Sequence, residues 1–342
     1  MPVDRPFRLA LVGAGLIAQQ AHLPAALASS QVEVVALVDP SPGRAAAVVR
    51  DWGIQATAAT SLDEVLGQID GAVIATPNDS HAQLGLRCVE AGVAALIEKP
   101  LCSTLEDAER LVALAEQRGV ALATGYSTRF RDSTILLKEL LDAGEFGRVK
   151  RFVHQFGTPG GWAALSSYNL QRKSIGGGVL VVTGTHFLDR MMYYWGFPDQ
   201  CELQDDGIDG PEANADATFV FERDGARIEG ATRYSKTGAL PAGLVIETER
   251  GIVKLADHDH AEIELLPGGR ADVSLTYKRR GKPRFDPAVS VFQHQIEEFV
   301  AAAREKRSPL VDGRQGLASM RLIEQLYSRR RTAVSDWYSE TA

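Results

Sequence analysis

Two hydrophobic patterns alternate along the first third of the chain. Short aliphatic runs that predict buried strands occur at Arg8–Val12, Val32–Val38, Gly71–Ala75, Val93–Ile97 and Val120–Thr124. Segments with helical spacing lie between them, at Leu16–Ser29, Gly43–Trp52, Ser61–Leu66, Ser80–Ala91 and Thr104–Arg118. Strands that are apolar on both faces and joined by helices are typical of a parallel sheet covered on each side. This part of the chain is therefore predicted to form a doubly wound α/β domain.

The pattern changes after Gly125. A helix is predicted at Ser133–Ala143, a strand near Val149–Phe156, and a long helix from the glycines Gly176–Gly178 to about Trp195. Six short β-rich runs follow, at Ala217–Glu222, Ala226–Ser235, Leu244–Thr248, Gly251–Leu255, Ala261–Leu266 and Val273–Tyr277. Consecutive strands with short connections predict an antiparallel sheet. Two helices, Val291–Arg304 and Gly313–Arg329, are predicted to close the chain.

These patterns predict two domains, in agreement with a length of 342 residues. We expect a Rossmann domain with a parallel doubly wound sheet at 1–125. An α+β domain with a large, mainly antiparallel open sheet is expected at 126–342, and its closing helix, 313–329, is a candidate to pack back on the first domain.

Composition narrows the class of protein. Lys and Arg number 37 and Asp and Glu 44, a net charge of -7, which disfavours a nucleic-acid partner. No uninterrupted run of about 18 apolar residues predicts a membrane span, and the polar start of the chain predicts no secretory signal. The three scattered cysteines are typical of a reducing compartment, and their spacing predicts no metal site. We therefore expect a cytoplasmic protein without a metal, a membrane or a nucleic-acid partner.

A phosphate-binding turn is predicted directly after the first strand. Gly13-Ala14-Gly15-Leu16-Ile17-Ala18 matches G-x-G-x-x-G/A and opens a helix. Gly13 permits the tight turn, Gly15 lets a pyrophosphate approach the backbone, and the helix N-terminus supplies amide donors. Asp39 ends the second strand, where a carboxylate accepts hydrogen bonds from the adenosine ribose. An anionic Asp39 would repel a 2′-phosphate, so NAD is predicted rather than NADP, although Arg44 could accommodate that phosphate.

Further polar clusters follow other predicted strands, where ligands of an open α/β sheet gather. They are Thr76-Pro77-Asn78-Asp79-Ser80-His81, Glu98-Lys99-Pro100, and Gly125-Tyr126 with Arg129. Together with Ala21-His22-Leu23-Pro24 and Gly176-Gly177-Gly178…Gly184-Thr185-His186…Asp189, this set resembles the glucose–fructose oxidoreductase/inositol dehydrogenase/rhizopine catabolism (Gfo/Idh/MocA) family over nearly the whole chain.

The resemblance implies particular roles. Lys99 corresponds to the family's catalytic lysine, whose bond to Pro100 is a candidate cis peptide, and His186 to the histidine that acts as acid/base in polyol dehydrogenases. The expected cofactor-binding set, which includes the turn, is Gly13, Gly15, Leu16, Ile17, Asp39, Thr76, Pro77, Asn78, His81, Glu98 and Lys99. The expected substrate-binding set is Lys99, Tyr126, Arg129, Trp162, Asn169, Arg172, Thr183 and His186. The last strands resemble an open sheet whose outer face commonly forms homodimers or homotetramers.

One position departs from the family pattern. The family motif Gly-Gly-Gly-x-Leu-x-Asp-x-Gly-x-His has an aspartate where this chain has Val182, one helical turn before His186. A valine removes a negative charge there and favours the neutral forms of Lys99 and His186. A lysine tuned in this way suits acid/base work on an alcohol–ketone pair.

The predicted function is NAD-dependent hydride transfer between nicotinamide and a secondary alcohol or ketone of a sugar, amino sugar or cyclitol. Lys99 and His186 form the predicted acid/base pair. Alternatives that the sequence leaves open are a keto-sugar reductase, an enzyme that regenerates NAD in place during epimerisation or glycoside cleavage, and a non-catalytic NAD-sensing regulator. The absence of the aspartate at Val182 keeps the regulator in consideration.

Overall fold

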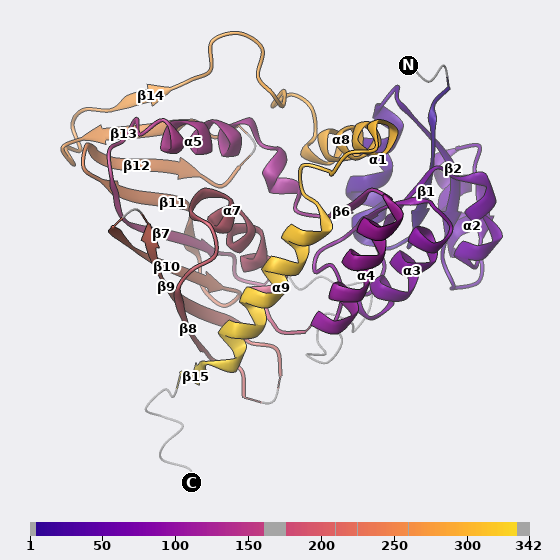
Figure 1. Ribbon diagram of the computed structural model, residues 1–342, viewed down its shortest axis with the longest axis horizontal. Helices are drawn as coiled ribbons and strands as arrows, with labels where there is room; N and C mark the ends of the chain where they lie inside the picture. The colour runs from indigo at the N-terminus through magenta and orange to yellow at the C-terminus, as the bar shows by residue number, and fades with distance from the viewer. Residues whose placement is uncertain (1–4, 161–175, 209, 224, 259, 334–342) are drawn as a thin grey trace. The chain divides into compact units, whose positions relative to one another are not determined.

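The computed structural model describes residues 5–160, 176–208, 210–223, 225–258 and 260–333. The chain divides into two compact units (Figure 1). The first unit holds the chain up to Phe130 together with Ala288–Met320, and the second holds most of the remainder. This division differs from the predicted 1–125 and 126–342 because a late segment, Ala288–Met320, groups with the first unit. None of the helices in the described ranges combines the length and apolar character that crossing a bilayer requires.

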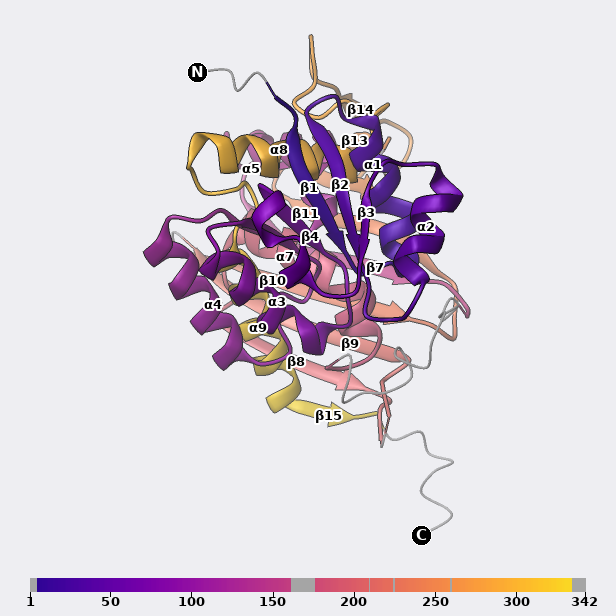
Figure 2. The ribbon, with the colours of Figure 1, turned by 90° about the vertical axis from the view of Figure 1, so that its right-hand side faces the viewer.

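The first unit contains a six-stranded parallel sheet in the order β3-β2-β1-β4-β5-β6. Its strands are β1 (Phe7–Val12), β2 (Val32–Val38), β3 (Thr57–Ala59), β4 (Gly71–Ile74), β5 (Ala94–Ile97) and β6 (Leu122–Thr124), and Figure 2 shows β1, β2 and β3 side by side. The predicted doubly wound sheet is thus confirmed. The edge strand β3 was not predicted, because its three residues are mostly exposed and form no apolar run.

Helices cover both faces of this sheet. The helices are α1 (Leu23–Ala28), α2 (Arg44–Trp52), α3 (Asn78–Glu90), α4 (Leu105–Arg118) and α8 (Val291–Glu305). In β1, Leu9 and Leu11 pack with α1, α2 and α8, whereas Ala10 and Val12 pack with α3 and α4. Alternate side chains of a strand point to opposite faces, so two separate cores form. Helix α8 belongs to the core that contains Leu9 and Leu11, although it lies almost 300 positions after β1 in the sequence.

Three predicted helices differ in detail. Leu16–Ser29 is divided into a π-turn, η1 (Ala18–His22), followed by α1. Ser61–Leu66 forms only 3₁₀ turns, η2 (Leu62–Glu64) and η3 (Leu66–Gln68), and the Ser61 side chain caps the first of them. Helix α3 begins at Asn78 rather than at Ser80, because Pro77 occupies the position before its first turn.

The second unit is built on a nine-stranded sheet in the order β14-β13-β12-β11-β7-β10-β9-β8-β15. Its strands are β7 (Val149–Gly157), β8 (Gln200–Asp205), β9 (Asn214–Arg223), β10 (Ala226–Ser235), β11 (Leu240–Thr248), β12 (Gly251–Ala256), β13 (Ile263–Pro267), β14 (Leu275–Tyr277) and β15 (Arg330–Thr332). All pairs are antiparallel except β7–β10 and β8–β15, so the predicted mainly antiparallel sheet is confirmed. The polar residues of β8, exposed at every second position, explain why it was not predicted.

Helices pack on one face of the nine-stranded sheet. They are α5 (Asp132–Asp142), the π-turn η6 (Leu180–Gly184) that leads into α7 (Thr185–Trp195), and the later turns of α9 (Gly313–Ser328). Phe152 of β7 stacks on Trp195 of α7 with ring centroids 4.2 Å apart. On the opposite face Val153 and Val245, which pair across β7 and β11, are 37% and 41% exposed.

Candidate functional site

The predicted cofactor residues gather at one edge of the six-stranded sheet. Gly13 follows β1, Asp39 follows β2, Thr76 follows β4 and Lys99 follows β5. All six strands run in the same direction, so these positions share the carboxyl edge. The strand order reverses between β1 and β4, which is where open α/β sheets bind ligands.

The turn after β1 lies directly against the segment after β4. Gly13 has φ +97, and a Cβ atom there would come within 2.5 Å of the Ala75 carbonyl oxygen. Gly15, by contrast, faces open space, with no atom within 4 Å of a Cβ built on it. Leu16 and Ile17 are 39% and 40% exposed. A close turn, an open approach above it and two exposed apolar side chains beside it fit a bound dinucleotide.

Asp39 links the turn after β1 to the turn after β2. Its Oδ2 accepts the backbone N–H of Ala14 at 3.0 Å, and its Oδ1 accepts that of Ser41 at 2.8 Å. Arg44 Nη1 lies 3.7 Å from Asp39 Oδ2, and the Arg44 side chain is 55% exposed. The carboxylate therefore holds both turns in place, with a solvent-accessible cation beside it.

His81 connects the segments that follow β4 and β5. Nε2 of its fully buried ring lies 2.9 Å from the Thr76 carbonyl oxygen, and Nδ1 lies 2.9 Å from the Pro100 carbonyl oxygen. Burial lowers the pKa of His81, and these two carbonyls oppose that shift. The Lys99–Pro100 peptide bond is cis, as the resemblance suggested. His81 thus supports the turn that carries Lys99.

Glu98 is held from two sides beside Lys99. Its Oε1 accepts a hydrogen bond from His22 Nε2 at 2.8 Å, and its Oε2 accepts the backbone N–H of Lys99 at 3.1 Å. His22 is the last residue of η1, so this contact joins the helix after the phosphate turn to the end of β5. Sequence motifs place these residues in two separate clusters and do not reveal that they pair.

In the second unit, a narrow strip along η6 and α7 is accessible to solvent. Val182, Thr183 and His186 are partly exposed, whereas most of their neighbours on the same two turns are buried. Val182 and His186 are four residues apart, so they share one helical face. The predicted position of Val182 one turn before His186 is therefore observed.

Glu212 was not found by sequence reasoning. Its Oε1 accepts hydrogen bonds from Leu180 N at 3.1 Å and from the Tyr327 hydroxyl at 2.7 Å. A Cβ at Gly178 would lie 2.1 Å from the Glu212 carbonyl oxygen. The glycine run is needed for close packing around this buried carboxylate, which caps the start of η6. Its partners are distant in sequence, so no local signal indicates it.

The remaining predicted substrate residues divide into two groups. Tyr126 and Arg129 follow β6 and are 0% and 2% exposed, which favours packing over direct contact with a substrate. Trp162, Asn169 and Arg172 lie outside the described residues. Contact of these five with a substrate stays a prediction.

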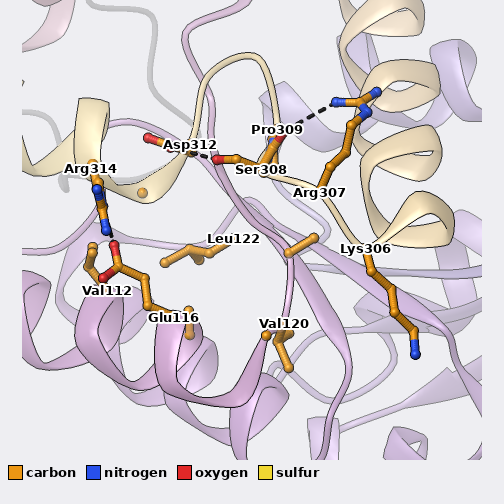
Figure 3. A pocket seen from close by; sticks show the side chains of 14 residues that line it. Val112, Glu116, Val120, Leu122, Lys306, Arg307, Ser308, Pro309, Asp312 and Arg314 are labelled. Atoms are coloured by element: carbon orange, nitrogen blue, oxygen red, sulfur yellow. Dashed lines mark hydrogen bonds and ion pairs between the residues drawn. The ribbon is translucent and has the colours of Figure 1, made fainter.

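A cavity of about 460 Å³ lies at the amino end of β6, away from the cofactor edge (Figure 3). It has an apolar floor that includes Val120 and Leu122 and a charged rim where Arg314 pairs with Glu116. No predicted site residue lines it. Within the described ranges, no group of three or more His, Cys, Asp or Glu side chains is arranged to hold a metal ion.

The fold and the turn geometry define the first unit as a dinucleotide-binding Rossmann domain. Residues 7–126 match the family described as "Oxidoreductase family, NAD-binding Rossmann fold". This match lies within the first unit and bears out the resemblance to the Gfo/Idh/MocA family over that part of the chain.

Two curated relatives resemble about half of the chain. A 1,5-anhydro-D-fructose reductase from Ensifer adhaerens is 32% identical over 190 residues, 54% of this chain and 56% of the relative. A D-glucoside 3-dehydrogenase from Escherichia coli (strain K12) is 31% identical over 199 residues, 56% and 55% of the two chains. The matched region thus spans only about half the length of these relatives.

The fold is shared over a longer stretch. The crystal structure of an aldose-aldose oxidoreductase from Caulobacter crescentus superposes with a TM-score of 0.81, covering 95% of this chain and 97% of that one at 22% identity. This likeness concerns the fold, because the identity is low.

Proposed function

We propose that this protein is a nicotinamide-dependent oxidoreductase that acts on a secondary alcohol or ketone carbon of a sugar, amino sugar or cyclitol. The observation that carries the proposal is the convergence of the open phosphate turn, Asp39 and Lys99 on one sheet edge. The names of the two curated relatives, a reductase and a dehydrogenase of sugar compounds, support this substrate class. The nicotinamide, when bound, accepts or returns the hydride.

The chain's own residues would bind, orient and manage the proton. Backbone N–H groups of the first helical turn have no intrahelical acceptors and can receive the pyrophosphate. Leu16 and Ile17 would cover the dinucleotide, and Thr76, Pro77, Asn78 and Glu98 would border it. We propose that Lys99 polarises the reacting oxygen and that His186 exchanges its proton, with Thr183 on the substrate side. Acid/base catalysis of such a proton transfer typically raises the reaction rate by about 10²–10⁴-fold.

The direct test follows NADH absorbance while NAD⁺ or NADP⁺ is mixed with a panel of sugars, amino sugars and cyclitols, and while NADH is mixed with the corresponding ketones. Turnover with any of them supports the proposal. Binding of NADH without turnover of any compound contradicts it. That result would favour the NAD-sensing regulator, a second candidate supported by the valine at position 182 in place of the family's aspartate.

We propose NAD as the preferred cofactor, because the Asp39 carboxylate would repel a 2′-phosphate. Asp39→Asn removes the charge but keeps one acceptor oxygen, and it leaves Arg44 free to pair with a phosphate. The ratio of kcat/KM for NAD⁺ to that for NADP⁺ is expected to fall by about 10–100-fold, the effect of one or two charge-assisted hydrogen bonds.

Steady-state kinetics with both cofactors measures this ratio. The control is Asp63→Asn, which removes an exposed carboxylate paired with Arg87, and it should leave the ratio unchanged. An unchanged ratio in Asp39→Asn would mean that Asp39 acts only through its bonds to Ala14 and Ser41.

We also propose that the exposed face of the nine-stranded sheet forms a homodimer or part of a homotetramer. Val153 and Val245 lie side by side at its centre, next to the Arg151–Glu247 ion pair. Val245→Asp is expected to shift the protein to monomers in sedimentation equilibrium. Val273→Asp changes a valine that is equally exposed, at 41%, outside the strands; if it dissociated the protein equally well, this assignment would be wrong.

A further inference from the structure

His22 occupies a position with little freedom in the first unit. It is fully buried at the end of η1, and Glu98 is 9% exposed. A carboxylate can only accept, so His22 Nε2 carries the hydrogen in the 2.8 Å contact with Glu98 Oε1. The ring also meets Phe292 of α8 edge-on, with centroids 5.1 Å apart and an interplanar angle of 84°. The hydrogen bond to Glu98 fixes the orientation of the imidazole, and Phe292 packs beside the ring.

Glu98 transmits this constraint to the next residue. Its second oxygen, Oε2, accepts the backbone N–H of Lys99 at 3.1 Å. Gly125 lies so close that a Cβ there would be 2.8 Å from Glu98 Cα and 3.0 Å from its carboxyl carbon. The carboxylate therefore has little room to rotate, and its two oxygens face two different segments of the site.

We propose that His22 is a positioning residue that holds Glu98 so that Lys99 presents its ammonium group in one direction. This inference rests on the proposed role of Lys99 as an acid/base group. The inference also links η1 to Lys99. This short π-helix follows the phosphate-binding turn, and through His22 it sets the geometry at the end of β5. The complete burial of His22 argues against direct contact between its ring and the cofactor.

Kinetics of three variants separate positioning from packing. His22→Leu removes the donor and is expected to lower kcat by about 10–100-fold, because misplacing a reacting group by about 1 Å has an effect of this size. KM for the cofactor should change by less than about threefold. His22→Gln keeps an N–H donor and should recover most of kcat. Phe292→Leu, the control, removes the other contact of the ring and should retain kcat.

Leaving Glu98 buried without its donor could prevent folding of the leucine variant. In that case His22→Asn replaces it, since its N–H donor is shorter and does not reach Glu98. Equal loss of kcat in the glutamine and the leucine or asparagine variants, or no loss in any of them, would overturn the proposal.

A readout without turnover keeps this inference separate from the proposed function. Lysines are reductively dimethylated with ¹³C-formaldehyde and a borane reductant, and the Lys99 signal is assigned by its loss in Lys99→Arg. We expect His22→Leu to shift and broaden that signal in the NADH-bound protein, while His22→Gln and Phe292→Leu leave it in place. An unmoved signal overturns the inference whether or not any sugar is oxidised. If the Lys99 signal shifts in His22→Leu but the wild-type protein oxidises no sugar, the positioning role of His22 is supported and only the proposed activity is contradicted.

Discussion

Replacing Lys99 with methionine is expected to lower kcat by about a thousandfold. The aliphatic stem of methionine fills a similar volume but cannot donate to or accept from the reacting oxygen, and a positioned acid/base group contributes about 10²–10⁴ in rate. Binding of NADH should change by less than about threefold, because the phosphate turn and Asp39 belong to other segments of the sheet edge. Single-turnover absorbance and a fluorescence titration with NADH measure the two quantities.

The matched control is Lys306→Met. Lys306 is an exposed lysine of the same unit, at the C-terminal end of α8 and on the rim of the cavity at the amino end of β6. It should keep wild-type turnover. Full turnover in Lys99→Met would remove Lys99 from the mechanism, and a parallel loss of NADH affinity would mean that it acts mainly in cofactor binding.

Much of the cofactor edge could be predicted from the sequence because its signals are local. Gly13 and Gly15 lie in one short motif after a strand, and Asp39 ends the next strand, so spacing alone brings them together. The confirmed parallel sheet follows from the same local regularity. The family resemblance then added Lys99 and His186, whose roles remain proposals.

Contacts between distant segments could not be predicted in this way. His22 and Glu98 are 76 positions apart, and Glu212 is 32 positions from Leu180. Helix α8 joins the first unit through contacts such as Phe7 with Phe299, which no periodicity indicates. The carboxylate of Asp257, which is 15% exposed, contacts two arginines that are distant in the sequence. Partner choice at these positions depends on tertiary structure.

That carboxylate is the centre of a buried ionic network in the second unit. Asp257 accepts hydrogen bonds from Arg190 at 3.0 Å and from Arg131, and its Oδ2 lies 3.4 Å from His154 Nε2. The Tyr234 hydroxyl lies 3.2 Å from His154 Nδ1. Burial would raise the pKa of Asp257, but the charges of Arg190 and Arg131 and the His154 hydrogen bond hold it well below its usual range.

Asp257→Asn is expected to lower the free energy of unfolding by about 3–5 kcal/mol, because it leaves the buried guanidinium of Arg190 without a counter-charge. Urea unfolding at pH 7 measures this loss. Asp199→Asn removes the carboxylate of an exposed pair with Arg223 and should cost far less, because solvent screens exposed ion pairs. Adding Arg190→Met to Asp257→Asn should restore part of the loss. A loss in Asp257→Asn no larger than that of the control would contradict the role of this network.

The same network predicts how stability depends on pH. Burial lowers the pKa of His154 from 6.5 to about 4, although the hydrogen bond to Asp257 opposes the shift. The unfolded chain therefore binds a proton below about pH 6.5 that the folded protein excludes until about pH 4. Stability from His154 is complete above pH 6.5 and falls by up to about 1.4 kcal/mol per pH unit through that window. Protonation of Asp257 removes a further contribution at still lower pH.

Urea unfolding of the wild type and of His154→Gln between pH 7.5 and 4.5 isolates this effect, because glutamine keeps a donor toward Asp257 but does not titrate. The difference in unfolding free energy between the two proteins should change by roughly 2–3 kcal/mol across this range, with the wild type losing more on acidification. His81, whose pKa is also lowered by burial, contributes equally to both proteins and cancels. Parallel pH curves would mean that the pKa of His154 is the same in the folded and the unfolded protein, which contradicts an effect of its burial on protonation.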